Sequence, residues 1–258
     1  MKTLVNIFLK PIYKKILNII NISYVDHKYK RFGREGDGGY VLPINIIEQN
    51  LKENFAVLTF GVNDDISFED QLKDYFENTN FFCFDPTISE PPKTKNNIYF
   101  EKLGVSDVNS QYYKTISYFI NKINKKNIIL KFDIEGYEWK IIKDINKIKE
   151  GLPIIICELH FKKTFNLLEK LFFPITLYFR YKKLNKLLKN YYITFINTNN
   201  IYYNEYSNFI FPNLLELTLV SKKEVVDFYL KESNGLNFKT DSNKTIYNYP
   251  FYRNDTKD

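Results

Sequence analysis

The chain has 258 residues, of which 44% are hydrophobic and 26% charged, a composition that fits one large or two small globular domains and excludes extended disorder. Its formal net charge of +7 favours an anionic partner. The 37 basic and 30 acidic residues are mixed along the chain without an arginine-rich arm, so a nucleic-acid partner is not expected. Cys83 and Cys157 lie in apolar runs, which predicts reduced, buried thiols in a cytoplasmic protein.

The N-terminal segment 1–24 is predicted to be helical. Residues 4–22 are apolar but interrupted by one proline and three lysines, so they do not suit a membrane span, and no signal-peptide pattern is present. We expect this helix to pack against the domain surface, with peripheral membrane contact and a homo-oligomer as the alternatives. Residues 25–238 form the main domain, and the polar segment 239–258 is expected to be loosely ordered.

A glycine-rich stretch from Arg31 to Leu42 places three glycines around Asp37. Glycines let the backbone approach a ligand closely, which makes Asp37 a candidate binding residue. The same pattern is typical of a hairpin whose second strand begins at Tyr40, and the local sequence favours neither interpretation.

The next unit is a buried strand, a glycine turn and a helix. Residues 55–60 are apolar, a turn begins at Gly61, and Ser67 with Asp70 form the expected capping pair of the helix. A glycine turn before a helix N-terminus suits a nucleoside-bearing ligand, so Gly61 and Asn63 are candidate binding residues. No GxGxxG pattern is present, which argues against a dinucleotide site.

A third strand, residues 81–84, ends in Asp85, which lies 24 residues after Gly61 (85 − 61 = 24). An acidic residue about 20 residues beyond the glycine turn is placed to bind ribose hydroxyls. A fourth strand over residues 98–106 is followed by Asp107, which either accepts a hydrogen bond from an adenine amino group or is a solvated turn residue.

The most informative stretch begins at Ile128. It reads as a strand buried on both faces, with Asp133 and Glu135 where the strand ends and an amphipathic helix from Glu138 after a glycine turn. Ligands of open α/β sheets bind beyond the carboxyl ends of the strands, so both carboxylates are candidate site residues. Helix capping explains Glu135 equally well.

A fifth strand over residues 153–160 also ends in ionisable side chains, Glu158 and His160. Helices are expected over residues 116–123 and 165–190, and further strands over residues 192–197 and 216–221. The Asn-rich connection between these last two strands is long enough to face a substrate. The alternation of strands and helices predicts one doubly wound α/β domain with parallel strands.

Six motifs occur in order along the chain: Asp37-Gly-Gly-Tyr40, Thr59-Phe-Gly-Val-Asn-Asp64, Phe84-Asp-Pro-Thr87, Leu103-Gly-Val-Ser106, Lys131-Phe-Asp-Ile-Glu-Gly-Tyr-Glu138 and Glu158-Leu-His160. Together they resemble the FkbM-type S-adenosylmethionine-dependent methyltransferases over about residues 30–221. The resemblance implies a class I methyltransferase (Rossmann-like) fold with a mostly parallel seven-stranded sheet. It also implies S-adenosylmethionine as the cofactor.

The resemblance further implies which residues hold the cofactor. Gly61 and Asn63 would bind its methionine end, Asp85 its ribose, and Ser106 with Asp107 its adenine side, while Asp37 would lie near the methionine or the acceptor. Family members mostly methylate hydroxyls of sugars, glycolipids or polyketides. We therefore expect an O-methyltransferase whose acceptor is a nucleotide-linked sugar or a precursor of a surface (capsular) polysaccharide.

Methyl transfer to a hydroxyl needs alignment of the reacting atoms and a base that takes the proton. His160, whose ordinary pKa lies near neutrality, and Asp133 are the candidate bases, with Glu135 beside them. Asp133, Glu158 and His160 are also suited to share a Mg²⁺ or Mn²⁺ ion that binds vicinal sugar hydroxyls. A phosphate of the acceptor would meet the basic residues after this strand: Lys162, Lys163, Arg180, Lys182 and Lys183.

Two other function classes fit the sequence less well. An NAD-dependent, nucleotide-sugar-modifying Rossmann enzyme would be expected to carry the missing GxGxxG pattern. A non-catalytic binding module of the same fold would be expected to have lost the acids at the strand ends, and these are all present.

Overall fold

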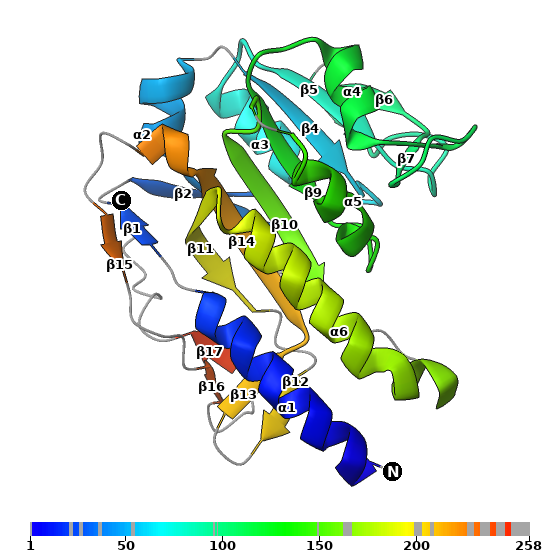
Figure 1. Cartoon of the computed structure of the whole chain (residues 1–258). Coiled ribbons are helices and arrows are strands. Elements are labelled where there is room, and N and C mark those ends of the chain that lie inside the picture. The colour runs from blue at the N-terminus through cyan, green and yellow to red at the C-terminus, as the bar shows by residue number, and fades with distance from the viewer. Residues whose placement is uncertain are drawn as a thin grey trace.

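The computed structural model of the chain describes all residues except 1, 21–22, 26–27, 36–37, 53–54, 95, 97, 149, 162–166, 199–202, 207–208, 226–229, 233–237, 241–245 and 249–258. Its centre is a seven-stranded sheet in the order β11-β14-β10-β9-β4-β5-β6 (Figure 1). Its strands are β4 (Ala56–Phe60), β5 (Asn80–Phe84), β6 (Tyr99–Glu101), β9 (Ile128–Phe132), β10 (Ile154–His160), β11 (Tyr191–Asn197) and β14 (Leu214–Ser221).

Six of these strands run in the same direction, and β14 is antiparallel to both of its neighbours, β10 and β11. In space, β4 is followed by β5 and β6 toward one edge of the sheet, and β9 is followed by β10, β14 and β11 toward the other edge. The strand order therefore reverses between β4 and β9. This is the strand arrangement of class I methyltransferases, and the predicted fold class is confirmed. Ligands of such sheets bind at the reversal point, beyond the carboxyl ends of the strands.

Alternating side chains of the central strands enter two cores, one on each face of the sheet. Ala56, Leu58 and Phe60 of β4 belong to one core, and Val57 belongs to the other. The first core is covered by α1 (Lys2–Ile19), α4 (Ile116–Ile123), α5 (Glu138–Ile145) and α6 (Leu167–Leu187). The second is covered by α2 (Ile44–Ile46), the π-helical turn η1 (Ile47–Leu51), α3 (Ser67–Tyr75) and the hairpin of β2 (Tyr29–Phe32) and β3 (Tyr40–Pro43).

The remaining elements are short. They are the pairs β1 (Ser23–Val25) with β15 (Leu230–Glu232), β7 (Gly104–Val105) with β8 (Tyr113–Lys114), β12 (Tyr203–Tyr206) with β13 (Phe209–Pro212) and β16 (Phe238–Thr240) with β17 (Ile246–Asn248), and the 3₁₀ turn η2 (Lys222–Val225). None of these four pairs was predicted: β1 begins inside the segment expected to be helical, and β7 was expected to continue the fourth strand. The β12–β13 hairpin lies in the Asn-rich segment expected to be a loop, and the β16–β17 pair lies mainly in the segment expected to be loosely ordered.

The N-terminal helix packs against the domain, as expected. Its inward face is Leu9, Tyr13, Ile16 and Ile20, all buried in the first core, and α1 lies directly against α6. In the described part of the chain, no helix is both long and apolar enough to cross a lipid bilayer.

Two local predictions were wrong. The N-cap position of α3 is occupied by Ile66, and the preceding residue, Asp65, accepts a hydrogen bond at Oδ1 from the Ser67 N–H at 2.9 Å. The Ser67 hydroxyl accepts a hydrogen bond from the Arg34 N–H of the glycine-rich hairpin instead of capping the helix. The predicted fourth strand, residues 98–106, is divided into β6 and β7, because β7 leaves the main sheet to pair with β8. Both cysteines are buried and free, as predicted.

Candidate active site

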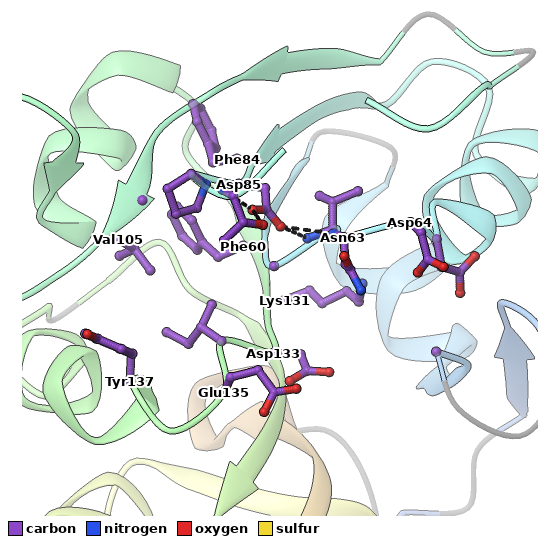
Figure 2. Close-up of a pocket in the computed structure, with 18 of the residues that line it drawn as sticks. Phe60, Asn63, Asp64, Phe84, Asp85, Val105, Lys131, Asp133, Glu135 and Tyr137 are labelled. Carbon is purple, nitrogen blue, oxygen red and sulfur yellow. Dashed lines mark hydrogen bonds between the residues drawn. The ribbon is translucent and has the colours of Figure 1, made fainter. Parts of the chain in front are cut away.

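A cavity of about 450 Å³ opens beyond the carboxyl ends of β4, β5 and β9, at the point where the strand order reverses (Figure 2). Its wall combines aromatic, acidic and basic side chains, which suits a ligand with an apolar ring and charges of both signs. The aromatic residues are Tyr40, Phe60, Phe84, Tyr113 and Tyr137; the acidic ones are Asp64, Asp65, Asp85, Asp133 and Glu135; and the basic ones are Arg34 and Lys131.

The glycine turn after β4 packs directly on the end of β9. Gly61 has φ +78°, and a Cβ atom added to it would lie 1.7 Å from the Asp133 carbonyl oxygen. The Gly61 N–H donates to the Phe84 carbonyl at 3.2 Å, and the Asp133 N–H donates to the Phe60 carbonyl at 3.1 Å. Only glycine fits here, because its conformation and the close approach both exclude a side chain. The ends of three strands are thus held together at the floor of the cavity.

Asp85 organises this turn through both of its carboxylate oxygens. Oδ2 accepts hydrogen bonds from the N–H groups of Val62 and Asn63, each at 2.9 Å. Oδ1 accepts from the N–H and the hydroxyl of Thr87, at 2.8 and 2.5 Å. Burial opposes ionisation of Asp85, but these bonds outweigh it and lower the pKa of the carboxyl. Asp85 lines the cavity, and its four bonds within the protein show that it shapes the turn after Gly61, whereas its role toward a ribose stays a prediction.

The glycine-rich stretch adopts the predicted hairpin, and its interpretation as a ligand-binding loop stays a prediction. It forms the β2–β3 hairpin, and its tip reaches the cavity through Arg34 and Gly38. The Arg34 Nε lies 3.2 Å from Asp65 Oδ2, and a Cβ atom at Gly38 would meet that same oxygen at 2.3 Å. Close approach of the hairpin backbone to Asp65 therefore requires glycine. Asp37 itself lies outside the described residues.

A buried ion pair lies at the back of the cavity. The Lys131 ammonium is 3.1 Å from Glu69 Oε1, which also accepts a hydrogen bond from the Thr59 hydroxyl at 2.8 Å. The ammonium lies over the rings of Tyr40 and Phe68, at 5.0 and 5.1 Å from their centroids. Glu69 is fully buried. A charged pair so far from water is sustained only by such partners.

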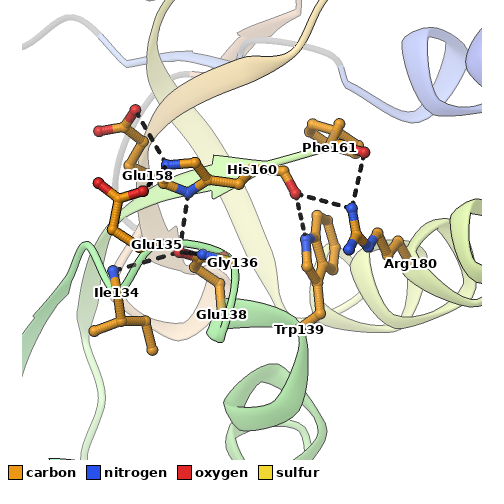
Figure 3. A network of polar contacts seen from close by, with 9 residues as sticks. All are labelled: Ile134, Glu135, Gly136, Glu138, Trp139, Glu158, His160, Phe161 and Arg180. Carbon is orange, nitrogen blue, oxygen red and sulfur yellow. Dashed lines mark hydrogen bonds and ion pairs between the residues drawn. The ribbon is translucent and has the colours of Figure 1, made fainter. Parts of the chain in front are cut away.

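A second polar cluster lies at the ends of β9 and β10 (Figure 3). Glu138 is fully buried, and its Oε1 accepts hydrogen bonds from the N–H groups of Gly136 at 2.8 Å and Ile134 at 3.3 Å. The same oxygen lies 3.0 Å from Nδ1 of His160. Nε2 of His160 lies 3.4 Å from Glu135 Oε2. Glu138 therefore fixes the orientation of the imidazole ring.

The charges of this cluster favour the protonated form of His160. Burial lowers the pKa of His160, but the hydrogen bond with Glu138 and the negative charges of Glu138, Asp133 and Glu135 outweigh burial and raise it. Glu158 Oε1 lies 3.9 Å from Nε2 on the same side. A raised pKa makes the neutral ring, which is the form that accepts a proton, less populated, and the role of His160 as the base stays a prediction.

Asp133 lines the cavity, and one of its two carboxylate oxygens lacks a hydrogen-bond partner among the described residues. Its Oδ1 is buried and has no hydrogen-bond partner in the described part of the chain. Burial raises the pKa of Asp133, against the opposing influence of His160, a hydrogen bond with Glu158 and the charge of Lys131. Beside it, Glu135 adopts the left-handed conformation with φ +53°, which is uncommon for a residue with a side chain and is often found at functional sites.

The strand end that carries His160 is clamped by two helices. Trp139 Nε1 of α5 donates a hydrogen bond to the His160 carbonyl at 2.7 Å. Arg180 Nη1 of α6 donates to the same carbonyl at 3.1 Å and to the Phe161 carbonyl at 2.8 Å. Lys183 of α6 donates to the Trp139 carbonyl. Arg180 and Lys183 are thus engaged inside the protein rather than presented to a phosphate, while Lys162 and Lys163 lie outside the described residues.

The geometry also brings together a possible set of cation ligands. Single ligand atoms of Asp133, Glu135 and His160 all lie within 4.8 Å of one another. The predicted set had Glu158 in place of Glu135. Glu158 is close to His160, but it is almost fully buried, whereas the Glu135 side chain is 83% exposed and lines the cavity.

Ser106 and Asp107 lie at the edge of the site. The neighbouring Gly104 and Val105 line the cavity, whereas Ser106 is buried and Asp107 is exposed just beyond the wall. The Ser106 hydroxyl donates a hydrogen bond to Asp107 Oδ1 at 3.4 Å. Their assignment to the adenine side stays a prediction.

Comparison with known proteins adds the family. The model of the methyltransferase FkbM domain matches residues 20–191, about two thirds of the chain. The chain belongs to the FkbM methyltransferase family. Among solved structures, a chain in the crystal structure of a fibrillarin/Nop5p complex is similar to this protein. The similarity covers 72% of this chain and 86% of that chain, with 13% sequence identity and a TM-score of 0.42, and it is too distant to inform function. A comparison with curated proteins finds no significant match.

Within this FkbM domain, sequence reasoning located most of the site but missed three contributors. Gly61, Asn63, Asp85, Asp133 and Glu135 line one cavity, and His160 lies behind Glu135. The contributors that were missed are Glu138, Lys131 and Arg34. The signal for Lys131 was a single charge inside an otherwise apolar strand, and the signal for Glu138 was its place three residues after Glu135 in the same motif.

Proposed function

We propose that this FkbM methyltransferase is an S-adenosylmethionine-dependent O-methyltransferase that acts on a sugar hydroxyl, either of a nucleotide-linked sugar or of a surface-polysaccharide precursor. The observation that carries the proposal is the buried, unpaired Oδ1 of Asp133 on the cavity wall. It offers a hydrogen-bond acceptor where a hydroxyl must lose its proton.

The cavity fits S-adenosylmethionine by the chemistry of its wall. Phe60, Phe84 and Tyr113 offer apolar faces for an adenine ring, and Arg34 and Lys131 are cations suited to a carboxylate. The acids complement the positive sulfonium and amino groups. The bound cofactor would supply an electrophilic methyl group together with its leaving group, so the protein has only to align the acceptor and remove a proton.

Asp133 is the proposed base. Burial raises the pKa of its carboxyl above the ordinary range, which moves it toward the pH at which a general base is most effective. His160 is proposed as a positioning residue: held by Glu138, its imidazolium offsets the negative charge of Asp133 and Glu135. Asp133 can then face the acceptor hydroxyl with an unpaired oxygen.

A cation held by Asp133, Glu135 and His160 is the alternative arrangement. In that arrangement Glu138 would orient the histidine ligand, as carboxylates behind metal-binding histidines commonly do. The raised pKa of His160 favours its cationic form, which in the metal-free arrangement would place one positive charge among the carboxylates.

The test is single-turnover methyl transfer from labelled S-adenosylmethionine to a panel of free, nucleotide-linked and lipid-linked sugars. Asp133→Asn should slow the chemical step by roughly 100- to 10,000-fold while leaving cofactor affinity nearly unchanged. Glu150→Gln, at a residue whose side chain is 81% exposed, is the matched control and should leave the rate unchanged. An undiminished rate in Asp133→Asn, or methylation of no sugar, would refute the proposal.

A further inference from the structure

Two neighbouring helices expose large apolar side chains, α1 within its N-terminal half and α6 from near its N-terminal end to just past its middle. Ile7 and Phe8 of α1 are 63% and 60% exposed, and Phe172, Ile175 and Phe179 of α6 are 56%, 56% and 59% exposed. We call these five residues the apolar tip. Apolar side chains gathered on one surface commonly mark an interaction site. They are not needed for the fold, because the same helices bury other residues in the core.

The apolar tip lies on the side of the molecule where the candidate active site opens. Helix α6 follows β10 and precedes β11, which runs parallel to β10, so α6 begins at the carboxyl edge of the sheet and returns to the amino edge. Helix α1 lies against α6 and runs in the same direction. The N-terminal ends of both helices therefore project past the carboxyl end of β10 (Figure 1).

Exposed lysines follow the apolar residues in both helices. Lys14 and Lys15 come after Ile7 and Phe8 on α1, and Lys182 and Lys186 come after Phe179 on α6. Residues 1–22 contain no acidic residue, and α6 contains one, Glu169. The surface thus has apolar side chains toward one end of the two helices and lysines after them; we call these four lysines the lysine collar. Burial of apolar area and attraction of basic side chains to anionic lipids both strengthen the binding of a protein to a bilayer surface.

We propose that the α1–α6 surface docks onto an anionic lipid bilayer, with the apolar tip among the acyl chains near the headgroups and the lysine collar on the phosphates. Charge argues for this occupant over a second copy of the chain. A symmetric dimer through the same surface would bring the lysines of one copy against those of the other, whereas an anionic headgroup layer complements them.

Docking in this way presents the carboxyl edge of the sheet, and with it the cavity, to the membrane side. The acceptor class that follows is a sugar carried on a lipid, such as a membrane-bound polysaccharide precursor. This second step rests on the proposed function, whereas the bilayer contact does not. Because Arg180 on α6 holds the end of β10, the helix that docks is also fastened to the strand that carries His160.

The experiment is vesicle flotation of the full chain with phosphatidylcholine alone and with phosphatidylcholine mixed with phosphatidylglycerol, at low and high salt. The wild type should bind the anionic vesicles, and raised salt should weaken binding. The double variant Lys14→Gln, Lys15→Gln should lose about 30-fold in binding, because each basic residue near the surface contributes roughly a fivefold factor. The matched control is Lys125→Gln, Lys126→Gln, at two exposed lysines before β9 on the opposite edge, and should bind like the wild type.

A second pair of variants tests the apolar contact. Phe8→Ala with Phe179→Ala should reduce binding even at low salt, whereas Tyr118→Ala, at an exposed aromatic residue of α4, should not. Calorimetric titration with S-adenosylhomocysteine and circular dichroism establish that each variant is folded and binds cofactor.

Two results would overturn the proposal directly: no binding of the wild type to anionic vesicles, or equal binding by all variants. A third is a dimer that does not bind vesicles and that the Phe8 and Phe179 substitutions dissociate. Vesicle binding without any methyl transfer would instead contradict the proposed function alone. Methylation of soluble sugars in preference to lipid-linked ones would remove the acceptor class and keep the bilayer contact.

Discussion

Replacement of Glu138 by Gln should change the ionisation of His160 and the stability of the protein together. Glu138 Oε1 accepts bonds from Gly136, Ile134 and His160, and the His160 side chain is only 13% exposed, so solvent screens this ion pair little. Gln keeps an oxygen of the same shape but removes the charge. Burial, which lowers the pKa of His160, is then less strongly opposed, so the pKa should fall.

The effect on stability has a defined pH dependence. The pKa of His160 is raised in the folded protein, so its contribution is fully present below the unfolded value, about 6.5, and is lost as pH rises through the folded value. A hydrogen bond to a charged partner contributes about 1.5–3 kcal/mol. The wild type should therefore exceed Glu138→Gln in unfolding free energy by about that amount at acidic pH, and the difference should narrow at alkaline pH.

The assay is ring NMR titration combined with denaturant unfolding across the pH range, in the presence of a chelator. The chain has two histidines, His27 and His160, and a His27→Asn background separates their signals. Glu150→Gln removes an exposed carboxylate and is the control. An unchanged titration of His160 in Glu138→Gln, or a stability difference that grows with pH, would refute the reasoning.

Three further results are expected. Asp85→Ala should weaken S-adenosylhomocysteine binding by about 1.5–3 kcal/mol, because four hydrogen bonds from the turn after Gly61 and from Thr87 lose their acceptor. Calorimetry that finds wild-type affinity in the folded variant would exclude a role for Asp85 in cofactor binding. Lys131→Met should lower the unfolding free energy by about 3–5 kcal/mol in denaturant unfolding, because Glu69 is left buried without its cation. The double variant Lys131→Met, Glu69→Leu should recover most of that loss. Equal losses in the single and the double variant would show that the pair is uncoupled. Turnover should survive treatment with a chelator, because the His160 imidazolium already balances its neighbours; abolished activity that Mg²⁺ or Mn²⁺ restores would assign the cation site instead.

The sequence predicted the features that depend on local pattern and on the geometry of parallel sheets. Sequence analysis predicted three central strands correctly, because continuous apolar runs mark strands that are buried on both faces. They are the strand before Gly61, the strand ending at Asp85 and the strand from Ile128. Their acids lie together because parallel strands end at the same edge of a sheet. Gly61, Asp85 and Asp133 therefore met in one cavity, as expected.

The missed features depend on partners far away in the sequence. Lys131 sits in an apolar strand because Glu69, 62 residues earlier, lies across from it on α3, and no local pattern reveals such a pair. Arg180 looked like one more basic residue of a lysine-rich helix, whereas the packing of α6 turns it toward the end of β10. Ser67 does not cap α3: its hydroxyl accepts a hydrogen bond from the Arg34 N–H of a distant hairpin, and its own N–H is bonded by Asp65.

These distant contacts connect the outer helix to the chemistry of the site. Arg180 of α6 holds the carbonyl of His160, the ring of His160 is held by Glu138, and Glu138 also fixes the turn that contains Glu135. Asp133, the proposed base, shares the electrostatic field of all three carboxyl neighbours, Glu135, Glu138 and Glu158. If α6 binds to a bilayer, the contact is therefore connected to the cavity wall through this series of hydrogen bonds. That coupling gives a physical reason for one helix to combine an exposed apolar end with a buried arginine.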